Sequence, residues 1–301
     1  MSLGCTVILG GAGASAVPAP DAQPVRYVAM GDSAAAGPLI WPQADWPCAR
    51  AERDWPRIVA ERLGVRELTD VTCSGATIQD FSHAQATLVP SGSASGSASP
   101  TAQFDALSEL TDLVTVEVGG NDIGTVGVGV RCLDYVPGGA DCARAFNADG
   151  DEIARRIEAF RPKYAAMLTE IHRRAPKARV VTVGYGTYLP LNGCDGQPFR
   201  PESANYLQGM IFRLDQMIAD ESAADRPGKP GERQAQYVDI ATPSRDHNMC
   251  AAPQVQWFYG VSPKDVALTP FAGAAPLHPT ALGMQGIAEV ISAAIMAGTT
   301  G

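Results

Sequence analysis

Residues 25–33 read VRYVAMGDS, and this stretch is the strongest single indication of the fold. The run at 25–31 is short, mostly apolar and ends in a glycine, which predicts a buried β-strand. Comparable apolar runs occur at 113–118 and 178–184, and stretches with helical spacing separate them. Runs of this kind are typical of parallel strands that are covered on both faces. The pattern therefore predicts an α/β protein.

The rest of the chain continues the alternation of strands and helices. Further strands are expected at 67–72 and 237–240, and helices at 55–63, 104–110, 151–175, 204–220 and 281–297. Pro162 is expected to kink the helix at 151–175 or to begin a new one. Residues 91–102 and 123–148 are rich in small residues and are expected to form loops. This order predicts one domain with a doubly wound parallel sheet, whose ligands lie at the carboxyl ends of the strands.

The composition narrows the classes of partner. The 301 residues carry a formal net charge of -9, and 46% of them are hydrophobic. An acidic surface repels nucleic-acid phosphates, so nucleic acid is not an expected partner. The basic residues within 155–174 are interpreted as a solvated helix face, which places His172 on the surface. The sequence contains no phosphate-binding loop, no His-Glu-x-x-His motif and no metal-ligand cluster, so neither a cofactor nor a metal is expected.

The first 24 residues have the character of an export segment. Residues 4–16 are apolar and end in a small-x-small pattern, and residues 17–24 are rich in proline and alanine. We interpret 1–24 as the remnant of a signal peptide and a linker, although no positively charged region precedes the apolar run. No other stretch reaches the roughly 18 apolar residues that a membrane span needs. We therefore expect a single domain at 25–301, a secreted or cell-envelope location and no transmembrane segment.

Seven cysteines are present, and six of them could form disulfides. Six cysteines allow fifteen pairings. Pairing along the chain would join Cys48 with Cys73, Cys132 with Cys142 and Cys194 with Cys250, which would indicate an oxidising compartment. The alternative is six buried free thiols in a cytosolic protein.

Four short segments carry residues suited to chemistry, three of them after predicted strands and one before the last helix. They contain Ser33, Gly75, Asn121 and His278. A serine at a strand end can point into the crevice, a glycine can bring its N–H close to a ligand, an asparagine amide can donate to an oxyanion, and a histidine can act as a base near neutral pH. Each segment also has an ordinary interpretation, as a helix cap, a turn or a loop. The Gly-x-Ser-x-Gly motif of α/β-hydrolases is absent.

Together, the four segments resemble the SGNH (GDSL) hydrolase family. The matching blocks are 31–33, Gly75, 119–122 and 278–279, and the likeness spans residues 25–297. The resemblance implies a flavodoxin-like fold, a three-layer α/β/α sandwich with a central five-stranded parallel sheet. It also implies that Ser33 is the nucleophile and His278 its general base. The backbone N–H groups of Ser33 and Gly75 and the side chain of Asn121 would hold the oxyanion.

The sequence departs from the family pattern at one position. Most family members have an aspartate three residues before the histidine, and Ala275 stands there in this chain. We therefore expect the carbonyl of Ala275 or Pro276 to orient the imidazole, as in some secreted members. Asp32 is expected to have a structural role. The six cysteines resemble those of secreted actinobacterial esterases and lipases, which implies the three local disulfides.

These features predict a secreted carboxylic ester hydrolase, an esterase or lipase, that acts as a monomer on small-molecule or lipid esters. Carbohydrate O-deacetylation and acyl transfer to an alcohol would use the same site. A non-catalytic envelope-binding protein is the alternative from another class, and it would be expected to lack Ser33, Asn121 or His278. Four residues after the nucleophile are expected either to line an acyl pocket or to pack in the core or in a loop: Leu39, Ile40, Trp41 and Trp46.

Overall fold

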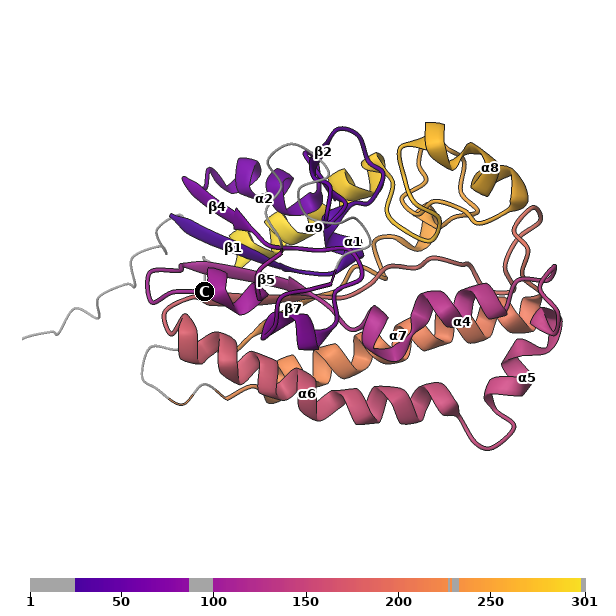
Figure 1. Cartoon of the computed structure of the whole chain (residues 1–301), viewed down its shortest axis with the longest axis horizontal. Coiled ribbons are helices and arrows are strands. Elements are labelled where there is room, and N and C mark those ends of the chain that lie inside the picture. Colours follow the sequence, from indigo (N-terminus) through magenta and orange to yellow (C-terminus); the bar gives the residue numbers. More distant parts are fainter. Residues whose placement is uncertain (1–24, 87–99, 227, 229–232, 299–301) are drawn as a thin grey trace, which may run out of the picture.

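A computed structural model describes residues 25–86, 100–226, 228 and 233–298. Five parallel strands form its centre in the order β4-β1-β5-β6-β7 (Figure 1). They are β1 Arg26–Gly31, β4 Glu67–Asp70, β5 Leu113–Glu117, β6 Arg179–Val183 and β7 Gln236–Val238. Every pair of neighbours in this sheet is parallel. The predicted α/β class and five-stranded parallel sheet are therefore confirmed.

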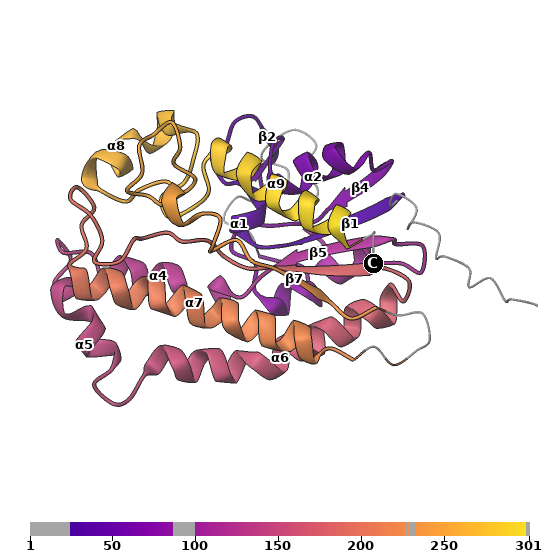
Figure 2. The same ribbon diagram turned by 180° about the vertical axis from the view of Figure 1, so that it is seen from behind.

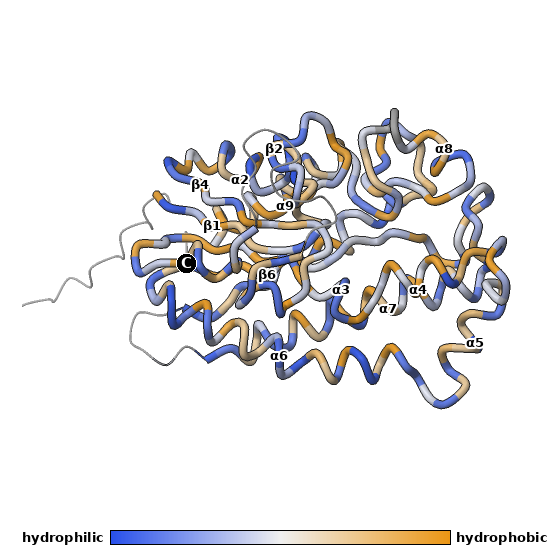
Figure 3. The backbone as a smooth tube through the Cα atoms, viewed as in Figure 1, coloured by the Kyte–Doolittle hydropathy of each residue, from blue (hydrophilic) through white to orange (hydrophobic). Residues whose placement is uncertain are grey.

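Two layers of helices cover the sheet, as the two opposite views show (Figures 1 and 2). On one face lie α2 Trp55–Leu63 and α9 Ala281–Ala297, and on the other α6 Glu152–Arg174 and α7 Pro201–Ala224. The backbone coloured by hydropathy shows α6 and α7 alternating between polar and apolar residues (Figure 3). The arrangement is the three-layer α/β/α sandwich that the resemblance implied.

The alternation of side chains along β1 divides the core in two. Val28 and Met30 belong to the hydrophobic cluster on the α6 and α7 side, whereas Tyr27 and Ala29 belong to the cluster on the α2 and α9 side. Successive side chains of a strand point to opposite faces, so a strand buried on both faces is apolar throughout. This is why the apolar run at 25–31 predicted the fold.

Helix ends follow the capping residues in the sequence. Asp54 accepts a hydrogen bond from the Arg57 N–H at the start of α2, and Gly64 ends that helix in the left-handed conformation. Thr280 accepts one from the Gly283 N–H, so α9 begins at Ala281, three residues after His278. Side-chain acceptors at these positions satisfy N–H groups that have no partner within the helix.

Several predicted elements differ from the structure. Residues 123–148 were expected to form a loop, but they contain α4 Thr125–Arg131 and α5 Cys142–Phe146. The prediction was wrong because tertiary packing outweighs the low helix propensity of glycine: Val128 and Gly129 of α4 are buried. The expected helix at 104–110 is a single 3₁₀ turn, η2 Gln103–Ala106, and a further helix, α8 Pro263–Ala272, was not expected.

Pro162 was expected to kink the helix at 151–175 or to begin a new one. It does not begin a new helix, because α6 continues from Glu152 to Arg174 with Pro162 inside it. His172 was placed on the surface, but it is buried and its Nε2 lies 2.8 Å from Asp225 Oδ2. The part of α6 that carries the basic residues is therefore buried on one side and is not a fully solvated face. Most of the loop predicted at 91–102, and all of residues 1–24, lie outside the described residues.

The remaining elements are short. They are α1 Ser33–Ala36, β2 Gln43–Asp45, β3 Arg50–Ala51, η1 Ile78–Phe81, α3 Gly120–Ile123, η3 Gly139–Asp141 and η4 Arg245–His247. Three disulfides join Cys48 to Cys73, Cys132 to Cys142 and Cys194 to Cys250, as expected. Among the helices of the described residues, none combines the length and hydropathy of a membrane span.

Candidate active site

Ser33 stands directly beyond the carboxyl end of β1. Gly31 has φ +149°, and a Cβ there would lie 2.5 Å from the Glu117 carbonyl oxygen, so only glycine fits this approach to β5. Asp32 then donates its N–H to Glu117 O and accepts the Ala34 N–H on Oδ1. Asp32 thereby caps α1 and places Ser33 at the first position of that short helix. The expected structural role of Asp32 agrees with this geometry.

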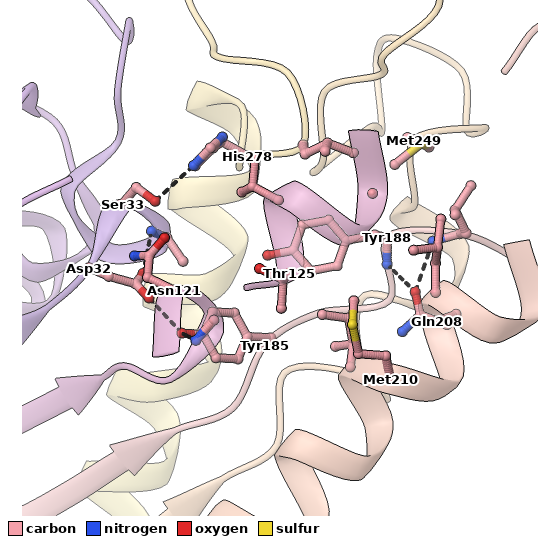
Figure 4. A pocket seen from close by; sticks show the side chains of 18 of the residues that line it. Asp32, Ser33, Asn121, Thr125, Tyr185, Tyr188, Gln208, Met210, Met249 and His278 are labelled. Carbon is pink, nitrogen blue, oxygen red and sulfur yellow. Dashed lines mark hydrogen bonds between the residues drawn. The ribbon is translucent and has the colours of Figure 1, made fainter. Parts of the chain in front are cut away.

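His278 reaches Ser33 from the other end of the chain. The two residues are 245 positions apart, yet His278 Nε2 lies 2.8 Å from Ser33 Oγ (Figure 4). The loop that carries the imidazole is held by backbone bonds, since Tyr259 N–H donates to the His278 carbonyl and Leu277 N–H donates to the Tyr259 carbonyl. These bonds fix the position of the histidine immediately before α9.

A backbone carbonyl sets the tautomer of His278. Nδ1 lies 2.8 Å from the Pro276 carbonyl oxygen. A carbonyl oxygen can only accept, so Nδ1 carries the hydrogen and Nε2 is left to accept the Ser33 hydroxyl proton. Of the two expected carbonyls, that of Pro276 contacts the ring, whereas that of Ala275 accepts the His278 backbone N–H.

The electrostatics of this pair differ from those of a triad with a carboxylate. Desolvation by burial lowers the pKa of His278, and the bond to the Pro276 carbonyl raises it by less, so the pKa is below its ordinary value. Ala275 stands where most family members have the orienting aspartate. The neutral imidazole, which is the form that accepts a proton, is therefore favoured.

Three donors in the motif segments keep a hydrogen that no hydrogen bond of the described residues uses. Asn121, on α3 after β5, donates one amide hydrogen to the Ala76 carbonyl at 2.9 Å, and its second amide hydrogen remains. This bond ties α3 to the turn that contains Gly75, which has φ +84° and is exposed. Within the described part of the chain, the N–H groups of Ser33 and Gly75 donate no hydrogen bond. Free donors of this kind can stabilise developing negative charge.

An apolar pocket opens beside the Ser33–His278 pair. It holds about 670 Å³ of empty space, part of it open to solvent, between α4, α7 and the segment that follows β6. Ser33 and His278 lie at one end, and Tyr188, Met210 and Met249 lie at the other (Figure 4). The pocket thus extends away from the reactive atoms along a mostly hydrophobic wall.

The residues that the sequence suggested for this pocket lie elsewhere. Ile40 is buried in the core between the sheet and the α2 and α9 layer. Trp41 and Trp46 are exposed and contact one another edge to face, with ring centroids 5.0 Å apart. Neither they nor Leu39 line the pocket. The interpretation as acyl-pocket residues is therefore wrong, and the alternative, core or loop packing, holds for Ile40, Trp41 and Trp46, because the chain after α1 turns toward the opposite face of the sheet.

Comparison with known proteins agrees with this arrangement. A model of the GDSL-like lipase/acylhydrolase family matches residues 29–285. The chain belongs to this family. It is 32% identical over 289 residues to Lipase 2 of Streptomyces coelicolor, covering 92% of this chain and 88% of the relative. It is 30% identical over 217 residues to an esterase of Streptomyces scabiei, covering 63% of this chain and 61% of the relative.

Solved structures of the family share the fold. An extracellular lipase from Streptomyces rimosus superposes with a TM-score of 0.67 at 22% identity, covering 90% of this chain and 99% of that one. Phospholipase A1 from Streptomyces albidoflavus gives a TM-score of 0.65 at 23% identity, with the same coverage. As a family member with lipase and esterase relatives, the chain is a carboxylic ester hydrolase.

Several pocket residues of this GDSL-like hydrolase were not found from the sequence. Thr125, Val126 and Gly129 come from α4, which was expected to be a loop, and Leu207 comes from the predicted amphipathic helix. Tyr185 follows β6 and lies between two glycines at a strand end. The rule that ligands bind at the carboxyl ends of parallel strands was the available signal for Tyr185.

Proposed function

We propose that this chain is a secreted serine esterase or lipase that cleaves acyl esters through an acyl-Ser33 intermediate. The observation that carries the proposal is the 2.8 Å contact between Ser33 Oγ and His278 Nε2 at the end of an apolar pocket. His278 takes the Ser33 proton as Oγ bonds to the ester carbonyl carbon, and the alcohol leaves with a proton returned by His278. Water activated by the same imidazole then cleaves the acyl-enzyme and releases the acid.

The oxyanion of each tetrahedral intermediate is held by three neutral donors in this proposal. They are the backbone N–H groups of Ser33 and Gly75 and the free amide hydrogen of Asn121. The hydrogen bond from Asn121 to Ala76 keeps the amide in place before substrate arrives. Donors arranged in advance need no reorganisation when charge develops, which lowers the barrier.

The pocket favours an extended acyl chain over an acetyl group. Its wall contains the side chains of Leu189, Phe199 and Leu207, and these would be left in contact with water by an acetylated sugar. The names of two similar proteins, a lipase and a phospholipase A1, also support an extended acyl chain as the substrate. Carbohydrate O-deacetylation and transfer to an alcohol would use the same serine, but they fit this wall less well.

Secretion is supported by two observations. The three disulfides join cysteines that are 25, 10 and 56 positions apart, and such bonds persist in oxidising compartments. A structural neighbour is described as an extracellular lipase. We therefore propose that the enzyme acts outside the cytoplasm.

A series of p-nitrophenyl esters from acetate to palmitate tests the proposed activity. We expect turnover of the series, with kcat/KM rising from acetate to chains of medium length. A non-catalytic binding protein would release no p-nitrophenol above the buffer rate. A preference for acetate over every longer chain would contradict the proposed role of the apolar pocket.

Gly129 is expected to control the length of acyl chain that the pocket accepts. It is buried in α4 and lines the pocket, and a Cβ there would lie 3.3 Å from Leu277 Cδ1. Gly129→Leu should lower the ratio of kcat/KM for laurate to that for butyrate by at least about 10-fold, the lower end of the effect of one methylene group in a hydrophobic pocket.

Gly127 provides the matched control for Gly129→Leu. It is in the same helix but is exposed, and a Cβ there meets no atom within 4 Å. Gly127→Leu changes helix propensity by the same amount and should leave the laurate-to-butyrate ratio within about 2-fold of wild type. Equal effects of the two substitutions would rule out a role of Gly129 in chain-length selection.

The pH dependence of activity is expected to reflect the lowered pKa of His278. Only neutral imidazole accepts the serine proton, so activity is lost as the pH falls through this pKa. Because the pKa lies below the ordinary value of 6.5, the acid midpoint of kcat/KM should lie below pH 6.5. A midpoint above pH 6.5 would contradict this.

Asp32 is the other group in the pocket that could titrate in this range, because burial raises its pKa to about 7. The profile should therefore be measured in wild type and in Asp32→Asn, where the second titration is removed. The acid midpoint that remains in Asp32→Asn is the one expected below pH 6.5.

A further inference from the structure

One hydroxyl group connects the two turns that carry the reactive residues. Tyr185 Oη donates a hydrogen bond to Asp32 Oδ2 at 2.7 Å and accepts one from the Gly120 N–H at 2.8 Å (Figure 4). Asp32 immediately precedes Ser33, and Gly120 immediately precedes Asn121. The distance between the two turns is therefore spanned by a third segment, the residues that follow β6.

The tyrosine is held firmly enough to act as a spacer. Only 5% of its surface is exposed, and its own backbone N–H donates to Asp215 Oδ1 at 2.7 Å. The turn at Gly120 packs directly on the phenol, since a Cβ at Gly120 would lie 3.1 Å from the hydroxyl oxygen. A shift of the ring would therefore move Gly120, and Asn121 with it.

Both hydrogen bonds of the hydroxyl involve groups that have little access to water. Asp32 is 2% exposed, and its only other side-chain bond within the described residues comes from the Ala34 N–H. Gly120 is buried, and its N–H has the Tyr185 oxygen as its acceptor. Buried polar groups without a partner are costly, so loss of the hydroxyl would drive both turns to rearrange.

We propose that Tyr185 is a positioning residue that sets the spacing between the Ser33 nucleophile and the Asn121 oxyanion donor. The inference rests on the proposed function, and it concerns a residue that makes no contact with the reacting atoms in that mechanism. The ring contributes to the pocket wall, whereas the hydroxyl contributes to the geometry of the two turns. Substrate binding and turnover are thus separable at this residue.

Tyr185→Phe tests the proposal because it removes the hydroxyl and keeps the ring. We expect kcat for p-nitrophenyl butyrate to fall between about 10- and 100-fold, the scale of a misplacement near 1 Å, while KM stays within about 3-fold. Tyr27→Phe is the matched control: Tyr27 is fully buried and its hydroxyl lies 2.8 Å from Thr115 Oγ1. Tyr27→Phe should lower the Tm by about as much as Tyr185→Phe does, and it should leave kcat unchanged.

A double substitution shows whether Tyr185 acts through Asn121. Asn121→Ala alone is expected to lower kcat between about 100- and 1,000-fold. If Tyr185 positions that amide, Tyr185→Phe combined with Asn121→Ala should be within about 3-fold of Asn121→Ala. Losses that multiply would overturn the proposal, as would a kcat within 2-fold of wild type in Tyr185→Phe, a loss confined to KM, or an equal loss in Tyr27→Phe.

The failure of this inference can be told apart from the failure of the proposed function. If wild-type hydrolysis depends on Ser33 but Tyr185→Phe turns over like wild type, only the positioning role is wrong. If hydrolysis is absent in wild type or persists in Ser33→Ala, the proposed function itself fails.

Discussion

Ser33→Ala is expected to lower kcat for ester hydrolysis by about 10⁶-fold, the loss seen when the nucleophile of a serine hydrolase is removed. Ser33 Oγ has His278 Nε2 as its partner, and the substitution takes away the only atom that forms the acyl bond in this account. The fold should be unaffected because alanine is a strong helix former and Ser33 begins α1, followed by three alanines. Substrate binding in the apolar pocket should persist.

The measurement is kcat with p-nitrophenyl butyrate together with the Tm. Ser108→Ala, at an exposed position after η2, is the control and should match wild type in both. Ser33→Ala should match wild type in Tm alone. Retention of more than about 1% of wild-type kcat in Ser33→Ala would show that another group attacks the ester.

His278→Ala is expected to cause a loss of the same order, about 10⁶-fold in kcat, since the serine is a weak nucleophile without its base. The reason is specific to this site: Nδ1 is bound by the Pro276 carbonyl, and Ala275 offers no carboxylate that could substitute as a base. Residues that act as a unit are not additive. The double variant with Ser33→Ala should therefore be no less active than either single variant.

His247 offers a matched control for His278→Ala. Its Nδ1 also lies within hydrogen-bond distance of a backbone carbonyl, 2.6 Å from Val255 O, and its ring stacks on Trp257. It lies outside the pocket lining. His247→Ala should keep wild-type kcat after correction for folded fraction. If His278→Ala retained about one tenth of the wild-type kcat at neutral pH, His278 would not be the general base.

The fold was predictable where local pattern and tertiary environment agree. The strand β1 is apolar on both sides because both of its faces are buried, and α9 was predicted with its observed bounds, Ala281–Ala297. The four motif residues were found because their order and their places, three after predicted strands and one before the last helix, together resemble the family pattern. Ser33 and Asn121 line the same pocket because they follow neighbouring parallel strands, whose carboxyl ends share one edge.

The pocket could not be predicted in the same way. Its wall depends on α4, a glycine-containing helix whose stability comes from burial of residues such as Val128, and local propensity gives no sign of it. The direction taken by the chain after α1 also depends on packing, so the sequence left open whether Trp41, which is exposed, lines an acyl pocket or packs in the core or a loop. Tyr185 has no sequence motif, because its role arises from bonds to residues more than 60 positions away.

The central claim is that ester cleavage passes through a covalent bond to Ser33, and labelling tests it most directly. A p-nitrophenyl alkylphosphonate would bond to Ser33 Oγ through phosphorus as p-nitrophenolate leaves, giving a stable analogue of the tetrahedral intermediate. Intact-protein and peptide mass spectrometry should find one phosphonyl group per chain, on the peptide containing Ser33, in step with loss of hydrolysis. Label on a different residue, or hydrolysis that continues in fully labelled protein, would contradict the account.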